Sequence, residues 1–182
     1  IYQYESELVR QKLDTVVSPG EIAEYYAAHQ ANFQLRENIV KAAYVIIPVN
    51  SPVIGRMRNL LRSESNKDHE ALESLCQEHA DNFRLDLESW MPFSDLQKAV
   101  PLSAGDQEAF LSANRYFEVQ DSTSRYLVRI FEYKTKESVS PLSFETSNIR
   151  SVILNKRRFE LLSRLEEDLF KDALSKKKFE IY

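Results

Sequence analysis

The chain has 182 residues, of which 43% are hydrophobic and 29% charged, and it carries a formal net charge of −4. This is the composition of an ordinary folded protein of one or two domains, and its acidity argues against nucleic acid as a partner. Three widely separated glycines exclude a glycine-rich phosphate loop, and a single cysteine excludes a disulfide framework and a cysteine-based zinc site. No stretch reaches the roughly 18 consecutive apolar residues that a membrane-spanning helix needs.

The N-terminal third of the sequence predicts two helices and a strand. Residues 2–13 have the apolar face of an amphipathic helix. A second helix is expected to begin at Ser18, because Ser18 and Glu21 have the spacing of a capping box and Pro19 occupies the first helical position. Residues 39–47 are β-branched and aromatic, and they predict a buried strand that ends at Pro48.

The middle of the sequence predicts helices followed by a hairpin. Two helices are expected near 53–62 and 68–80, and on the second a face that includes Cys76 and His79 is expected to pack inward. A loop containing Trp90 follows. After it come a short helix over 106–113 and strands over 116–119 and 126–133. The segment 121–124 has turn chemistry, so these two strands are predicted to form a hairpin.

The C-terminal part predicts one long helix, from about 144 to about 175, which would measure about 45–50 Å at 1.5 Å per residue. Because such a helix is longer than the middle module, we expect it to pack on the N-terminal helices. The sequence thus predicts an α+β protein in which a domain with a small antiparallel sheet (38–136) is inserted between a helical segment (1–37) and a long C-terminal helix (137–182).

Conventional catalysis finds no support in the residues. Cys76 and His79 are three apart on one predicted helix, but no second pair completes a metal site. Clustered carboxylates such as Glu166 and Glu167 have basic neighbours at helical spacing, which is typical of surface ion pairs. No serine stands in a nucleophile elbow. We therefore expect neither a metal nor a cofactor.

Two end segments carry a resemblance to a known family. The run Ser18-Pro19-Gly20-Glu21-Ile22, with Tyr25, Tyr26 and Phe33, is similar to the linker helix of SurA-like periplasmic folding factors. These proteins insert a domain of the parvulin-type peptidyl-prolyl isomerases into a helical chaperone module. The C-terminal runs 153–158 and 179–182 resemble the tail of Bacteroidetes members. The resemblance implies a degenerate parvulin-like domain within a SurA-like module.

The same resemblance implies a candidate proline pocket at Tyr44, Trp90, Leu96, Val100 and Tyr126. The two active-site histidines of the family fall on Tyr44 and Tyr126, and only the tryptophan of the family's glycine-rich loop remains. Proline isomerisation makes no bonds. An isomerase only binds the twisted amide better than the planar one, across a barrier of roughly 18–20 kcal/mol. Because the polar groups of the pocket are replaced, we expect weak or absent isomerase activity.

The resemblance implies a folding factor that binds unfolded or extended exported polypeptides, such as outer-membrane protein precursors. One alternative is an active prolyl isomerase, and a second is a structural or assembly protein whose long helix pairs with a partner or a second copy. The family resemblance implies a periplasmic location. Since the chain begins at Ile1 without an export signal, we expect it to be cut from a longer precursor, whose missing N-terminal part would hold any lipid anchor.

Overall fold

The structure is a computed structural model that describes residues 11–175, so residues 2–10 of the predicted first helix and the tail motif at 179–182 lie outside it. The protein divides into two compact units. We call them the helical unit (Ile1–Gln30 and Glu145–Tyr182) and the sheet unit (Ala31–Phe144). The units divide at 30/31 and 144/145, whereas the predicted domain limits fall at 37/38 and 136/137.

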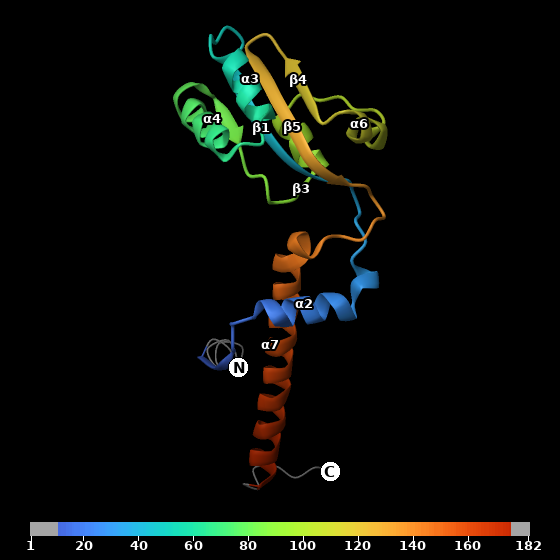
Figure 1. Cartoon of the computed structure of the whole chain (residues 1–182). Coiled ribbons are helices and arrows are strands. Elements are labelled where there is room, and N and C mark those ends of the chain that lie inside the picture. The colour runs from blue at the N-terminus through green and yellow to red at the C-terminus, as the bar shows by residue number, and fades with distance from the viewer. Residues whose placement is uncertain (1–10, 176–182) are drawn as a thin grey trace. The chain divides into compact units, whose positions relative to one another are not determined.

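The helical unit contains α2 (Pro19–Ala28) and most of α7 (Leu142–Ser175), which has 34 residues (Figure 1). The predicted capping box is confirmed: Glu21 N donates to Ser18 Oγ at 3.2 Å, and Ser18 N donates to Glu21 Oε2 at 2.9 Å. The predicted long C-terminal helix is also confirmed. Helix α7 is long enough to contact α2 along one part and to expose side chains to solvent along another.

Arg157 of α7 holds the start of α2. Its Nη1 atom donates to the carbonyl oxygens of Asp14, at 3.0 Å, and Val16, at 2.7 Å, while Nη2 donates to Glu21 Oε1. Hydrogen bonds from Ser18 and then from Arg157 lower the pKa of the Glu21 carboxyl. The C-terminal helix therefore meets the N-terminal segment at the start of α2 and at the residues just before it.

The sheet unit is an α+β fold built on an antiparallel sheet of five strands, with the order β2-β1-β5-β4 and β3 paired to β1. This confirms the predicted fold class. A short 3-10 helix, η1 (Gln30–Asn32), precedes the sheet. It is followed in sequence order by β1 (Ile39–Pro48), α3 (Ile54–Arg62), α4 (Asn66–His79), β2 (Asn82–Arg84), β3 (Met91–Pro92), α5 (Phe93–Ala99), α6 (Gln107–Ala113), β4 (Tyr116–Gln120) and β5 (Ser124–Lys134).

Strands β1 and β5, which are distant in sequence, form the centre of the sheet. Their register runs from Ile39 opposite Lys134 to Pro48 opposite Ser124, with a β-bulge at Lys41/Ala42. The predicted hairpin of β4 and β5 is confirmed. Asp121 closes it, since its Oδ1 atom accepts from the backbone N–H groups of Thr123 and Ser124.

The alternation of side chains along β1 sends residues to two separate cores, and helices cover both faces of the sheet (Figure 1). The α3–α4 cluster consists of Ala43, Val45, Ile47, Met57, Leu61, Leu72, Leu75, Cys76 and Leu127. The α5–α6 cluster, on the other face, consists of Val40, Ala42, Phe93, Leu96, Val100, Leu111, Val128 and Ile130. Burial also raises the pKa of the Cys76 thiol to about 12.

One expectation for this unit was incomplete and another was wrong. Trp90 lies in a loop as predicted, but the strands β2 and β3 and the helix α5 beside that loop were not predicted, because strands of three and two residues are too short to show a periodic pattern. His79 does not pack inward. It is the last residue of α4, its side chain is 40% exposed, and its Nε2 atom lies 3.6 Å from Glu78 Oε2.

A polar cluster around Glu118 joins helix α3 to the edge strand β4. Arg58 donates to both carboxylate oxygens, Arg125 Nη1 donates to Oε2 at 3.1 Å, and Tyr116 Oη donates to Oε1 at 2.7 Å. The Glu118 side chain is only 21% exposed. The hydrogen bond from Arg58 is the main reason that the pKa of Glu118 is lowered from 4.5 to about 2.

We predict that Glu118→Gln destabilises the sheet unit near neutral pH by roughly 2–3 kcal/mol. Because the folded-state pKa lies below the ordinary value, the contribution of the carboxylate is present above about pH 4.5 and is lost as the pH falls toward 2. The difference between wild type and variant in urea unfolding should therefore shrink over that range. Glu70→Gln, on the exposed side of α4, serves as the control, and a pH-independent difference would contradict the prediction.

Candidate functional site

The structure gathers four of the five residues predicted to line a proline pocket. Leu96 on α5 and Val100 at its C-terminal end are fully buried members of the α5–α6 cluster. Tyr44 on β1 and Tyr126 on β5 are half-buried and pack against the same cluster. Trp90 is not part of it.

Tyr44 and Tyr126 lie on one face of adjacent strands. Tyr44 is opposite Val128, and Tyr126 is opposite Ile46, so the two tyrosines are diagonal neighbours within reach of each other's rings. The hydroxyl of Tyr126 donates to Asp121 Oδ2 at 2.7 Å, and this bond is the main reason that the pKa of Asp121 is lowered to about 2. The hydroxyl of Tyr126 is thus already hydrogen-bonded to the turn of the hairpin.

The chemistry available in this cluster is limited. Leu96 and Val100 expose no surface on which a ligand could sit. The three histidines of the sequence lie elsewhere, His29 at the end of α2 and His69 and His79 on α4. The polar groups that remain are the phenol of Tyr44 and the pair formed by Tyr126 and Asp121. These residues therefore form a packed core against one face of the sheet and not an open polar pocket.

Trp90, just before β3, belongs to a different site on the sheet unit. Lys41 Nζ lies 5.1 Å from the centroid of its ring and also pairs with Glu132 Oε1 at 2.9 Å. Trp90 lines a groove of about 600 Å³ that we call the Trp90 groove. Its other lining residues are Arg115, Phe131, Glu132, Tyr133, Lys134, Thr135 and Ser138. Sequence reasoning missed this groove because its residues come from three distant segments that share no motif.

The helical unit carries a different kind of surface. Val152, Phe159 and Phe170 of α7 are 38%, 75% and 50% exposed. They are seven and eleven residues apart, and at about 100° per residue these spacings bring all three within about 20° of one line along the helix. We call these three residues the α7 stripe. Its ends are about 27 Å apart at 1.5 Å per residue.

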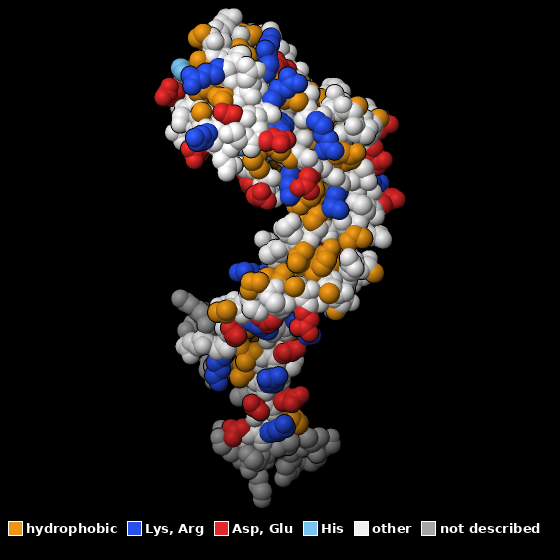
Figure 2. Space-filling model, viewed as in Figure 1, with side chains coloured by type: hydrophobic (Ala, Val, Ile, Leu, Met, Phe, Trp, Pro, Cys, Tyr) orange, Lys and Arg blue, Asp and Glu red, His pale blue; other side chains and the backbone are white. Residues whose placement is uncertain are grey.

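The α7 stripe lies away from the contact with α2. Arg157, which holds α2, is five residues after Val152 and therefore about 140° around the helix. A groove of about 390 Å³ follows the α2 contact, where Tyr25 stacks on His29 with centroids 4.2 Å apart, and Ile153 contributes from α7. Hydrophobic side chains are visible on the surface of α2 and α7 in Figure 2.

Residues 11–175 contain no group of three or more histidine, cysteine or acidic side chains that could hold a metal ion. Within the same range, no helix combines the length and the apolar composition needed to cross a bilayer.

No protein-family model and no curated protein matches the chain. A solved structure that matches comes from a study of the virulence factor PEB4 and the periplasmic protein Cj1289, described as two structurally related SurA-like chaperones of Campylobacter jejuni. The match covers 100% of this chain and 69% of that chain, with 11% identity and a TM-score of 0.35. At this TM-score the likeness adds no argument about fold or function.

We predict that Leu96→Ala destabilises the sheet unit by about 2–5 kcal/mol, because truncating a fully buried leucine removes packed atoms and leaves a cavity. Urea unfolding monitored by circular dichroism measures the change. Leu102→Ala, at a half-buried position beside the same cluster, is the control and should cost less. An equally small effect of both variants would mean that Leu96 lines an open pocket.

Proposed function

We propose that the protein is a SurA-like folding factor of the periplasm that binds extended, apolar segments of unfolded exported polypeptides, such as outer-membrane protein precursors. The observation that carries this proposal is the α7 stripe, an exposed line of one valine and two phenylalanines on a long helix. The resemblance of the segments 18–33 and 153–158 to folding factors of this family points in the same direction.

The stripe suits an extended client better than a compact ligand. Covering a phenylalanine side chain stabilises a complex by about 1.5–3 kcal/mol, so two phenylalanines separated by three helical turns give a modest total. A compact ligand would reach only one of them at a time. Contacts of this kind, without a charge-specific site, favour weak binding of many sequences.

The distribution of exposed side chains also favours the helical unit as the binding surface. The large hydrophobic residues that are exposed in residues 11–175 are Val16, Val139, Val152, Phe159 and Phe170. Of these, only Val139 belongs to the sheet unit. The sheet unit buries most of its apolar residues in two cores, whereas the helical unit leaves several large apolar side chains in contact with water. An exposed apolar patch often marks an interaction site.

Isomerase activity is the weaker candidate. The filled cluster around Leu96 and Val100 and the engaged hydroxyl of Tyr126 leave few groups able to favour a twisted amide over a planar one. Self-association of α7 is a further candidate, because a second copy would also cover the stripe.

We predict that Phe159→Ala combined with Phe170→Ala weakens binding of a urea-unfolded, fluorescently labelled outer-membrane protein about tenfold or more. Fluorescence anisotropy after dilution from urea measures the dissociation constant, and light scattering measures suppression of aggregation. Since both side chains are exposed, the free energy of unfolding should change by less than about 0.5 kcal/mol for each substitution.

Arg158→Ala is the matched control for the stripe, because Arg158 is exposed and lies about 100° around the helix from Phe159. It should bind as the wild type does. Equal binding by the double variant would contradict the proposal, and so would a wild-type protein that fails to suppress aggregation at several-fold molar excess. A wild-type dimer that becomes a monomer in the double variant would instead assign the stripe to self-association.

We predict that the wild-type protein does not accelerate proline isomerisation in a tetrapeptide above the uncatalysed rate. The reason is that the cluster formed by Tyr44, Leu96, Val100 and Tyr126 presents no open polar pocket. A protease-coupled assay measures the rate. Turnover that is present in the wild type and lost in Tyr126→Ala would show the opposite and assign the active site to this cluster.

A further inference from the structure

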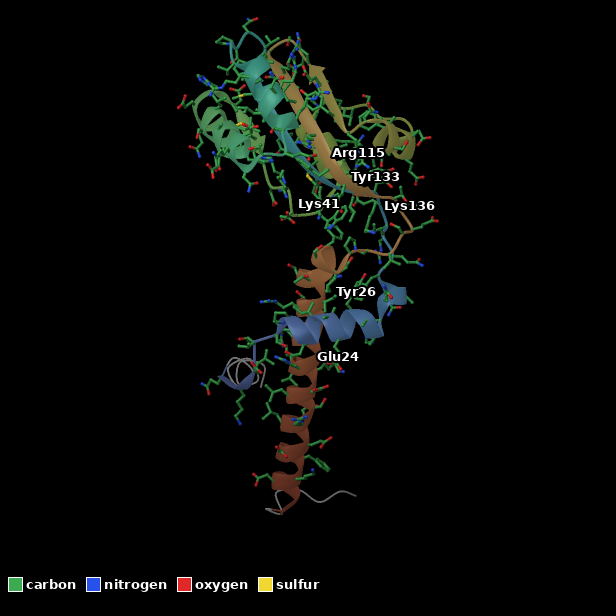
Figure 3. The ribbon with its side chains drawn as sticks, in the orientation of Figure 1. Glu24, Tyr26, Lys41, Arg115, Tyr133 and Lys136 are labelled. Carbon is green, nitrogen blue, oxygen red and sulfur yellow. The ribbon has the colours of Figure 1, made fainter. Side chains whose placement is uncertain are left out.

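Several side chains of the Trp90 groove, among them Trp90, Arg115 and Glu132, make contacts within the sheet unit. Figure 3 labels Lys41, Arg115 and Tyr133 at this end of the sheet, with Lys136 on the segment that leaves β5. The groove volume of about 600 Å³ lies within the range typical of ligand sites. Three of its eight lining residues are aromatic, and two of its three charged residues are basic.

Arg115 is held in place and still has donors to offer. Its Nη1 atom donates to the carbonyl oxygen of Phe131 at 3.0 Å, and its Cζ atom lies 5.3 Å from the centroid of the Tyr133 ring. Its own carbonyl oxygen accepts from Ile130 N at 2.8 Å, which fixes the backbone. A guanidinium has five N–H donors. The remaining ones can bind a carboxylate without the cost of ordering a flexible side chain.

The acidic residue of the groove is already neutralised. Glu132 Oε1 pairs with Lys41 Nζ at 2.9 Å, and the same ammonium group lies over the ring of Trp90. Arg115 and Lys134, in contrast, form no ion pair within residues 11–175, and both line the groove. The groove is therefore a local site of uncompensated positive charge in a protein whose net charge is −4.

We infer that the Trp90 groove binds a carboxylate-bearing segment of an extended polypeptide, with the carboxylate on Arg115 and Lys134 and a neighbouring aromatic or apolar side chain on Trp90. Charge complementarity selects the carboxylate, and the exposed part of the indole selects the apolar neighbour. This inference rests on the proposed function and extends it from a purely apolar surface to a second site with its own chemistry. The carboxylate belongs either to an Asp or Glu side chain or to the C-terminus of the bound polypeptide.

Trp90 supplies a direct readout, because it is the single tryptophan of the sequence. The probe is a blocked heptapeptide of alternating Phe and Asp, titrated against the 182-residue protein while indole fluorescence is recorded. We expect a saturable change in intensity or wavelength. A matched peptide with Asn in place of Asp should bind about tenfold more weakly, and binding of the acidic peptide should weaken with added salt. An Asn peptide with a free C-terminal carboxylate tests the second source.

Arg115→Met and Lys134→Gln should each weaken binding of the acidic peptide about tenfold. Lys136→Gln is the matched control, since it removes the same charge from a neighbouring position that does not line the groove. Circular dichroism melts check that each variant is folded. If Arg115→Met unfolds, Lys134→Gln alone decides the outcome.

A saturable response that depends on the carboxylate, on Arg115 and Lys134 and not on Lys136 supports the inference. No saturable response, equal binding of the Asp and Asn peptides, or an equal loss in Lys136→Gln would overturn it. The combined Phe159→Ala and Phe170→Ala variant should leave this response intact. If the acidic peptide does not bind but the α7 stripe still suppresses aggregation, only the inference about the Trp90 groove is wrong. If the peptide binds but the stripe does not suppress aggregation, only the proposal about the stripe is wrong.

Discussion

The pairing of β1 with β5 is the constraint on which the sheet unit depends. It joins residues 39–48 to residues 124–134 and thereby separates two cores, one on each face. It also places Lys41 opposite Glu132, and the Lys41 ammonium that pairs with Glu132 lies over the ring of Trp90. The same pairing brings Tyr44 near Tyr126. Beyond the sheet the same two segments continue as a ladder, where Leu35 N donates to Ser138 O at 2.9 Å and Ser140 N donates to Phe33 O at 2.7 Å. The backbone therefore enters and leaves this unit side by side.

The two units differ in how far they bury their apolar residues. The sheet unit buries them almost completely, and the polar cluster around Glu118 ties its edge strand to α3. The helical unit uses Arg157 to hold the start of α2 and leaves a line of apolar side chains on α7 in contact with solvent. Helix α7 is therefore held by polar contacts on one side and exposes apolar side chains on another.

The residues that the family resemblance assigns to a proline pocket do not form an open pocket in the structure. Four of its five residues meet at one cluster, yet Leu96 and Val100 are core residues and Tyr126 donates its hydroxyl to Asp121. The fifth, Trp90, lies with Lys41 and Glu132 at a groove of its own. Matching a residue to a family position does not determine whether its side chain lines a cavity or packs in a core. That depends on how the helices pack against the sheet.

Local signals in the sequence determined much of the secondary structure, since capping, periodicity and turn chemistry act over a few residues. The start of α2 at Ser18, the strand at Ile39–Pro48, the hairpin around Asp121 and the long α7 could all be predicted in this way. The strands β2 and β3, the helix α5 and the outward position of His79 could not, because they depend on pairing with β1 and on where α4 ends. Only the tertiary structure decided which apolar residues stay exposed and that Arg115, Lys134 and Trp90 share one groove, since these depend on contacts between residues far apart in the sequence.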